Sequence, residues 1–193
     1  IVKVVDPRPG EIMFGLNLVV NRGKTIFICD TSVIEYPDAK QLADMAKSAA
    51  RVVKLFFFDS KVAFLSHSTF GQPVTDRTKR ISDAVKILKK SNVDFKFDGE
   101  MQPDVALEEI YKELYPFSEI VGSSNVLIMP SQHSAAISYK MIKSMSRAKV
   151  IGPLLIGLGL PIEIAPLRSS TSEIINIASI AAYSADVIDY KKN

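Results

Sequence analysis

A loop rich in hydroxyl side chains and glycine is the segment of the sequence best suited to bind a charged ligand. It follows a strand-like apolar run, 62–66, and leads into a helical pattern that carries Arg77, Lys79 and Arg80. Ligands of open α/β sheets bind at the carboxyl ends of strands, where helix N-termini and exposed amides favour anions such as phosphate. The candidate contacts are Ser66, His67, Ser68, Thr69 and Gly71. An ordinary polar loop would have the same composition, and the sequence contains no Walker A loop.

Three carboxylates, Asp98, Glu100 and Asp104, follow another strand-like run. At this spacing they could bind a cation or serve general acid–base chemistry. A helix cap followed by acidic residues in the first turn would look the same, because negative charge stabilises a helix N-terminus. Capping is the interpretation that the sequence favours.

Few other side chains are suited to nucleophilic or metal chemistry, namely His67, His133 and a single cysteine, Cys29. A Ser–His–Asp triad can be drawn, but the GxSxG nucleophile elbow is absent. Two histidines and one cysteine argue against a structural zinc site, so we predict no metal site. Cys29 lies in an apolar run and is expected to be a small core residue, and it cannot form an internal disulfide.

The elements that must position these residues alternate between short apolar runs and longer helical patterns, which is typical of an α/β fold. We predict three layers around a mainly parallel sheet, with one antiparallel hairpin that turns at Asn21–Lys24. The predicted strands cover residues 1–5, 14–20, 25–29, 62–66, 95–97, 126–129, 150–156 and 162–165. The predicted helices cover 39–53, 76–90, 103–114, 134–145 and 170–188, with Asp38 and Ser170 as N-caps.

The last predicted helix has apolar side chains on almost every side, including Ile174, Ile175, Ile177 and Ile180. A helix of this kind is normally buried on several sides. We therefore expect residues 1–168 to form the α/β lobe, and residues 169–193 to form a helix that packs against a partner copy or a lobe outside this sequence. The chain begins with isoleucine rather than methionine, which fits a piece of a longer protein.

The composition excludes several classes of protein. The chain has 193 residues, of which 47% are hydrophobic, and a net charge of only +3, which excludes intrinsic disorder. No signal peptide and no apolar run of membrane-spanning length is visible. The basic residues are spread along the predicted helices, which argues against nucleic-acid binding. We expect a cytoplasmic protein whose partners are neither nucleic acid nor membrane.

Four segments, in order, resemble the phosphate acetyl/butyryltransferase family: 62–71, 98–107, 124–130 and 151–158. Residues 174–178 are similar to the C-terminal helix of that family. The resemblance implies a phosphotransacetylase-like second lobe, with the related isocitrate/isopropylmalate dehydrogenase-like architecture. The companion first lobe of the family would precede Ile1.

Within that family the chain is similar to the C-terminal domain of multidomain bacterial NADP-dependent malic enzymes. The segments that carry this similarity are 6–10, 68–71, 114–117, 133–135 and 164–167. It implies a tail associated with oligomer assembly and with regulation by acetyl-CoA. The expected partners are further copies of the chain and an N-terminal malic enzyme core, which would convert malate and NADP to pyruvate, CO2 and NADPH with a divalent metal. No cofactor is expected in this segment itself, apart from an acetyl-CoA effector.

The sequence departs from active transacetylases before the last helix. Those enzymes carry a Ser-Arg-Gly run and then an aspartate in the first turn of the helix, where the alignment places Pro166, Leu167, Arg168 and Glu173. Proline offers no donor to a thiol or phosphate and leucine cannot pair with an oxyanion, so we expect no catalytic residues here. Ligand binding is still expected at the 66–71 loop together with the last helix N-terminus, namely Arg168, Ser169, Ser170 and Thr171.

Three functions remain open from the sequence. The first is a non-catalytic, regulatory and oligomerising domain that senses acetyl-CoA. The second is an active phosphate acetyl/butyryltransferase, which would convert acetyl-CoA and phosphate to acetyl phosphate and CoA. The third is a purely structural dimerisation tail. Pro166 and Leu167 argue against the second.

Overall fold

The computed structural model describes residues 5–189 of the chain, and side chains up to residue 185. The helices and strands are β1 (Phe14–Asn21), β2 (Lys24–Cys29), α1 (Ala39–Leu55), β3 (Lys61–Leu65), α2 (Asp76–Lys89), β4 (Lys96–Met101), α3 (Pro103–Leu107), a 3-10 helix (Glu109–Lys112), β5 (Val126–Ile128), α4 (Gln132–Met145), β6 (Lys149–Ile156) and α5 (Thr171–Asp189). Within the described residues, no helix is both long and apolar enough to cross a membrane.

The six strands form one mixed sheet in the order β4-β3-β5-β2-β1-β6. The pairs β3–β4, β3–β5 and β2–β5 are parallel, whereas β1 pairs antiparallel with both β2 and β6. The predicted hairpin is confirmed, since Asn21 pairs with Lys24 across a turn in which Arg22 and Gly23 both have positive φ. The antiparallel pairing of β6 with β1 brings the first and the last described strands together, and it was not predicted.

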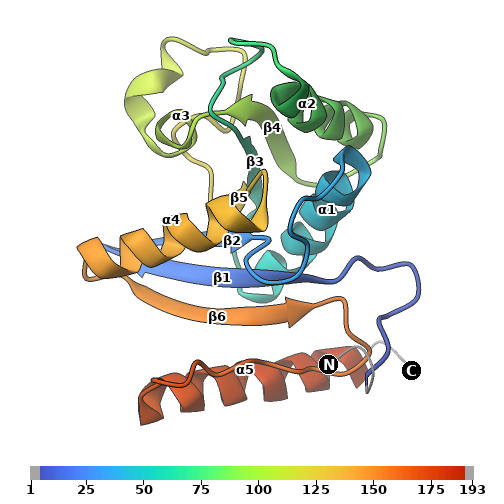
Figure 1. Cartoon of the computed structure of the whole chain (residues 1–193), viewed down its shortest axis with the longest axis vertical. Helices are drawn as coiled ribbons and strands as arrows, with labels where there is room; N and C mark the ends of the chain where they lie inside the picture. Colours follow the sequence, from blue (N-terminus) through green and yellow to red (C-terminus); the bar gives the residue numbers. More distant parts are fainter. Residues whose placement is uncertain (1–4, 190–193) are drawn as a thin grey trace.

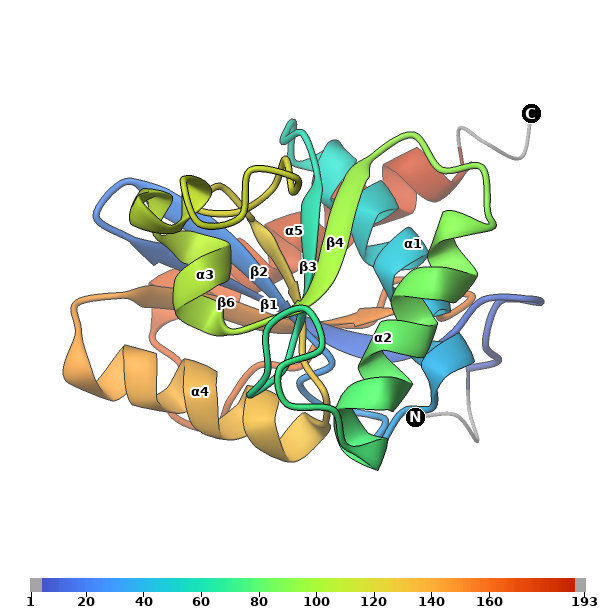
Figure 2. The same cartoon turned by 90° about the horizontal axis from the view of Figure 1, so that it is seen from above.

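The three predicted layers are confirmed. Helices α1 and α2 cover one face of the β3–β4 part of the sheet and α3 and α4 cover the other, while α5 lies along β6 (Figures 1 and 2). The first face buries a core that includes Phe14, Phe27 and Leu42. The second buries a core that includes Ile28 and Met101. Successive strand residues such as Phe27 and Ile28 therefore point to opposite faces, as a strand requires.

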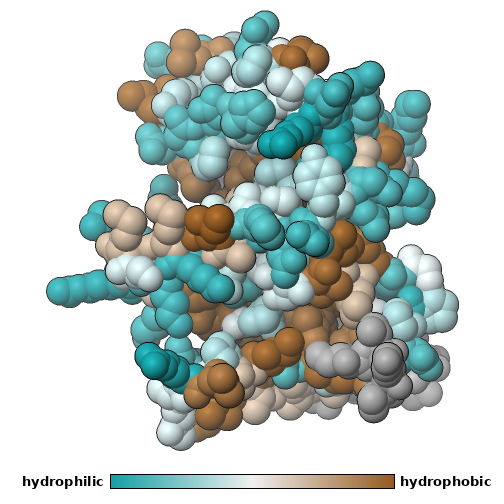
Figure 3. Space-filling model, in the orientation of Figure 1, coloured by the Kyte–Doolittle hydropathy of each residue, from teal (hydrophilic) through white to brown (hydrophobic). Residues whose placement is uncertain are grey.

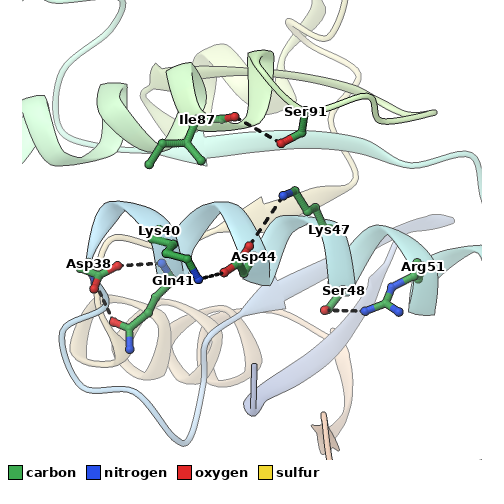
Figure 4. A network of polar contacts seen from close by, with 9 residues as sticks. All are labelled: Asp38, Lys40, Gln41, Asp44, Lys47, Ser48, Arg51, Ile87 and Ser91. Carbon is green, nitrogen blue, oxygen red and sulfur yellow. Dashed lines mark hydrogen bonds and ion pairs between the residues drawn. The ribbon is translucent and has the colours of Figure 1, made fainter. Parts of the chain in front are cut away.

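Helix α1 shows how the sequence builds these layers. Asp38 caps it by accepting a hydrogen bond from the Gln41 amide at 2.7 Å, and Gln41 Oε1 accepts one from the Asp38 amide at 2.8 Å, so the predicted cap is confirmed. The exposed side of the helix carries ion pairs from Asp44 to Lys40 and Lys47, at 3.0 and 3.7 Å (Figure 4). The opposite side is fully buried.

The predicted helix 103–114 stops early, at Leu107. The carbonyls of Val105 and Ala106 accept hydrogen bonds from the amides of Gly122 and Ser124, at 2.9 and 3.1 Å. In a continuing helix these carbonyls would instead accept hydrogen bonds from the amides of the next turn. The chain becomes extended at Glu108 and continues as a 3-10 helix.

The predicted strand 162–165 is also wrong, since this segment makes a single bridge between Glu163 and Leu154. The Glu163 carboxylate accepts the Leu155 amide at 3.1 Å, which is a backbone donor that a further strand would have bound. Pro161 and Pro166 flank the segment and lack amide hydrogens, which shortens any ladder. Of the predicted strand 1–5, residues 1–4 lie outside the described residues.

Candidate functional site

The 66–71 loop follows β3 and folds back onto the end of β4. Ser68 is fully buried, and its hydroxyl donates to Glu100 Oε1 at 3.2 Å. The Gly71 amide donates to the same oxygen at 2.6 Å, and the Phe70 amide donates to the Glu100 carbonyl at 2.7 Å. The Ser68 hydroxyl and the amides of Phe70 and Gly71 thus all donate to Glu100. A phosphate bound in this loop would be repelled by the Glu100 carboxylate.

Glu100 is the feature of this loop that sequence reasoning missed. The N-cap of α3 is Gln102, which makes no side-chain cap hydrogen bond, so only the first-turn acid is found: Asp104 lies in the first turn of α3 and accepts the Tyr111 hydroxyl at 2.9 Å. This hydrogen bond and the carboxylate charge raise the pKa of Tyr111. Glu100, in contrast, is buried at the end of β4 and holds the neighbouring loop. No trio of His, Cys, Asp or Glu side chains among the described residues could hold a metal ion.

Replacing Glu100 by alanine is expected to lower the free energy of unfolding by about 2–3 kcal/mol, because the Ser68 hydroxyl and the Gly71 amide would be buried without an acceptor. Glu100→Gln is the matched control, since its side-chain oxygen can still accept both hydrogen bonds, and we expect a loss of less than about 1 kcal/mol. Urea unfolding and protease cleavage within residues 66–75 measure the two effects. Equal losses in the two variants would contradict this role for Glu100.

Arg80, one of the basic residues behind the loop, is also occupied. Its guanidinium donates to the carbonyls of Pro37 and Pro130, and lies 3.6 Å from the centroid of the Tyr36 ring. Partial burial lowers the pKa of Arg80. The side chain therefore ties α2 to the loops that follow β2 and β5.

The two histidines are at the surface and the single cysteine is in the core. His67 and His133 are both exposed, and His133 Nε2 lies 3.6 Å from Glu35 Oε1 at the surface. Cys29 is fully buried in β2, and burial raises the pKa of its thiol well above the ordinary value. The prediction that Cys29 is a core residue is confirmed.

Two of the four residues predicted at the start of α5, Arg168 and Ser169, line a cavity of about 230 Å³ between α4, β6 and α5. Arg168 and Ser169 contribute to it together with Lys140, Lys143 and Glu173 from the two helices. Lys143 Nζ lies 3.7 Å from Glu173 Oε1. Three cations therefore share this cavity with one carboxylate, an arrangement that attracts an anion such as a phosphate.

The start of α5 is capped as predicted. Glu173 Oε2 accepts hydrogen bonds from the Ser170 amide and hydroxyl, at 2.8 and 2.9 Å, and the Ser170 hydroxyl accepts the Glu173 amide at 3.3 Å. These bonds to Ser170, with a further contribution from Lys143, lower the pKa of Glu173. Thr171 and Ser170 are exposed, so the polar side chains predicted here are at the surface.

The structure does not bring the two predicted groups into one cleft. None of residues 66–71 lines the cavity that contains Arg168. Helix α4 begins just after β5, near the 66–71 loop, and runs away from it, so that its last turn carries Lys143 to the start of α5 (Figures 1 and 2). The cationic cavity and the hydroxyl-rich loop therefore lie at opposite ends of α4.

Comparison with known proteins places this geometry in a family context. The model of the family described as phosphate acetyl/butaryl transferase matches residues 1–182. The chain is 44% identical over 183 residues to an NADP-dependent malic enzyme of Rhizobium meliloti, covering 95% of this chain and 24% of that protein. It is 32% identical over 169 residues to a phosphate acetyltransferase of Bacillus subtilis, covering 86% of this chain and 52% of that protein.

Among solved structures, a phosphotransacetylase from Streptococcus pyogenes superposes with a TM-score of 0.90 at 29% identity, covering 95% of this chain and 57% of that one. The phosphotransacetylase EutD from Staphylococcus aureus gives a TM-score of 0.87 at 26% identity, covering 95% of this chain and 58% of that one. The chain thus spans more than half of these phosphotransacetylases, and about a quarter of the malic enzyme from Rhizobium meliloti.

Proposed function

The chain belongs to the phosphate acetyl/butaryl transferase family, and we propose that it is a regulatory and oligomerising domain of a malic enzyme that binds acetyl-CoA without transferring its acetyl group. The similarity to malic enzymes, at 44% identity in Rhizobium meliloti and 35% in Escherichia coli, supports this parent protein. We assign the conversion of malate and NADP to pyruvate, CO2 and NADPH to a core outside this sequence, together with its divalent metal. We also place the whole protein in the cytoplasm.

The observation that carries the proposal is the loop before α5, which lacks the donors that acetyl transfer requires. Pro166 lines the cationic cavity and has no amide hydrogen to offer, and the side chain of Leu167 is fully exposed. Losing one positioned donor to a developing oxyanion typically costs about 3–4 kcal/mol, or a factor of about 100–1,000 in rate. Since two neighbouring positions are affected, we expect negligible turnover.

Binding of acetyl-CoA is supported by the cations that remain. Lys140 and Arg168 line the cavity and lie within 4 Å of no carboxylate among the described residues. Lys143 is already paired with Glu173, so the other two are the groups available to phosphates. We propose that the phosphates of CoA lie between Lys140 and Arg168, next to the N-terminus of α5, where the helix dipole adds to the attraction.

An oligomerising role is supported by exposed apolar surfaces. Helix α5 buries Ile177 against the lobe but exposes Ile174, Ile175 and Tyr183, and apolar residues gather along it in the space-filling view (Figure 3). Helix α4 exposes Ile137, Met141 and Met145, which lie four residues apart and therefore on one side of the helix. We propose that residues 169–193 pack against the companion lobe or against a second copy of the chain.

The proposed regulation follows from the position of the cavity between α4 and α5. A ligand that binds more tightly to one packing arrangement of α5 than to another shifts the population of assembly states. This shift would couple the cavity to the distant malic enzyme core. The malic enzyme core would sense acetyl-CoA through the assembly state of the tail.

A transferase assay and a binding titration on the intact protein test the proposal together. We expect no measurable formation of acetyl-CoA from acetyl phosphate and CoA, but saturable binding of acetyl-CoA by calorimetry. Arg168→Gln and Lys140→Gln should each weaken this binding by about tenfold, the effect of losing one charged hydrogen bond to phosphate. Arg147→Gln, at an exposed position just after α4, is the matched control and should bind normally.

Each alternative function has its own signature in the same experiment. Clear turnover of acetyl phosphate would establish an active phosphate acetyl/butyryltransferase instead. Absence of both turnover and acetyl-CoA binding would leave a structural dimerisation tail. Binding that Arg168→Gln and Lys140→Gln do not weaken would show that the cavity between α4 and α5 is not the acetyl-CoA site.

A further inference from the structure

A second cavity, of about 190 Å³, lies between the last turns of α1, the end of β6 and the second half of α5. Its wall is mostly aliphatic and includes Val52, Leu55, Leu154, Leu158 and Ile180. None of its lining residues belongs to the cavity that contains Arg168. Any ligand of this cavity is therefore separate from the proposed acetyl-CoA site.

Two oppositely charged side chains, Arg8 and Glu163, line the cavity without forming an ion pair with each other. Glu163 is half-buried, and among the described residues only its Oε2 has a hydrogen-bond donor, the Leu155 amide at 3.1 Å. Within the described part of the chain, no cation lies within 4 Å of Glu163 and no carboxylate lies within 4 Å of the Arg8 guanidinium. Burial raises the pKa of Glu163 to about 7, because a desolvated carboxylate without a counter-ion favours its neutral form.

The other two charged side chains that line the cavity, Arg51 and Glu11, form an ion pair with each other. Arg51 pairs with Glu11 at 2.9 Å. It also donates to the Ser48 hydroxyl at 2.9 Å, the contact drawn in Figure 4. Tyr183 of α5 also lines the cavity. Among the described residues, Arg8 and Glu163 are thus the two charged groups of the cavity without an oppositely charged partner.

We propose that this cavity binds a small apolar α-amino acid, whose ammonium group faces Glu163 and whose carboxylate faces Arg8. Its side chain would contact the aliphatic wall formed by α1, β6 and α5. An apolar carboxylic acid would leave Glu163 without a partner, and an apolar amine would leave Arg8 without one, so the zwitterion fits both charges. The volume is below the roughly 300–1,000 Å³ of pockets for drug-sized ligands, which suits a molecule of the size of leucine.

Such a ligand would touch three elements of the fold, α1, β6 and α5. Ile180 and Tyr183 from α5 face Val52 and Leu55 from α1 across the cavity. A bound amino acid would therefore fasten α5 to the lobe, and the domain would gain stability as RT ln(1 + [L]/Kd).

Calorimetry on the intact protein with L-leucine as the probe tests this proposal. We expect leucine to bind, and both 4-methylpentanoate, which lacks the ammonium group, and 3-methylbutylamine, which lacks the carboxylate, to bind at least about tenfold more weakly. Near pH 7, leucine binding should release up to about half a proton, because Glu163 starts close to half-protonated and an ammonium partner favours its ionised form. Proton release is measured as the dependence of the heat on the ionisation enthalpy of the buffer.

Variants at the two charged positions separate the contacts. Glu163→Gln keeps an oxygen for the Leu155 amide. This variant should lose the proton release and should bind leucine and 4-methylpentanoate equally. Arg8→Gln should instead bind leucine and 3-methylbutylamine equally. Arg22→Gln, in the exposed β1–β2 turn, is the matched control and should behave like the unchanged protein.

Three results would overturn the proposal. If the unchanged protein binds 4-methylpentanoate as tightly as leucine, the cavity is a simple anion site. If it binds 3-methylbutylamine as tightly as leucine, the cavity is a simple cation site. If about 10 mM leucine gives neither heat nor a rise in Tm, it is not an amino acid site. Acetyl-CoA titrations of Glu163→Gln keep this test distinct from that of the proposed function, because the two cavities share no residue.

Discussion

Replacing Asp30 by alanine is expected to lower the free energy of unfolding by about 4 kcal/mol, because four backbone amides would lose a buried acceptor. The Asp30 side chain is buried, with 1% of its surface exposed. It accepts hydrogen bonds from the amides of Gly15, Ser32, Val33 and Ile34 at 2.8, 2.8, 3.1 and 2.6 Å. This single carboxylate holds the chain as it leaves β2 and joins it to β1.

Two further variants make the Asp30 experiment specific. Asp30→Asn keeps one oxygen for three of the four bonds but places an amide group against the Ile34 amide, so we expect an intermediate loss of about 2 kcal/mol. Asp59→Ala, at an exposed position after α1, should change stability by less than about 0.5 kcal/mol. Urea unfolding measures all three. A loss for Asp30→Ala no larger than that for Asp59→Ala would contradict the anchoring role.

Gly157→Ala is the second substitution for which we expect a large effect, a loss of about 4 kcal/mol or failure to fold. Gly157 has φ +87, and a Cβ added there would lie only 2.3 Å from the Ile12 carbonyl oxygen. The segment cannot move aside easily, because the Arg8 amide donates to the Gly157 carbonyl at 2.9 Å. The N-terminal loop and the end of β6 are thus packed backbone against backbone.

Gly23→Ala separates crowding from backbone strain. Gly23 has φ +78, much like Gly157, but nothing lies within 4 Å of an added Cβ. We expect a loss of only about 1–2 kcal/mol, which is the strain of the left-handed conformation alone. Thermal unfolding of the two variants side by side gives the difference, and equal losses would show that contact with Ile12 is not what requires glycine at position 157.

The parts of the fold that sequence could predict depend on neighbouring residues. The caps at Asp38 and Ser170, the turn at Arg22-Gly23 and the burial of Cys29 all follow from short segments. The early end of α3 could not be predicted, because it depends on amides far along the chain that bind its carbonyls. The pairing of β6 with β1 was hidden for the same reason, since periodicity shows that a strand exists but does not name its neighbour.

In the candidate site, too, local features could be predicted from the sequence, whereas contacts between distant segments could not. Composition identified the 66–71 loop as a polar segment at a strand end, and the family resemblance pointed to the start of α5. It could not show that Glu100, which belongs to a different strand, already fills the loop with its carboxylate. Nor could it show that Lys140 and Lys143 join Arg168, because this depends on the direction in which α4 leaves the sheet. Spacing along the chain thus located the residues, and tertiary packing decided which of them face one another.

The pairing of the first described strand with the last one has a consequence for how the protein is made. On the ribosome β1 is synthesised early, yet one of its two edges stays open until β6 emerges at the far end of the domain. An open edge with apolar residues such as Phe14, Leu16 and Leu18 is a template for aggregation. Nascent or truncated chains that end before Lys149 should therefore depend on chaperones, whereas in the finished sheet Pro153, which has no amide hydrogen, helps to close the outer edge of β6.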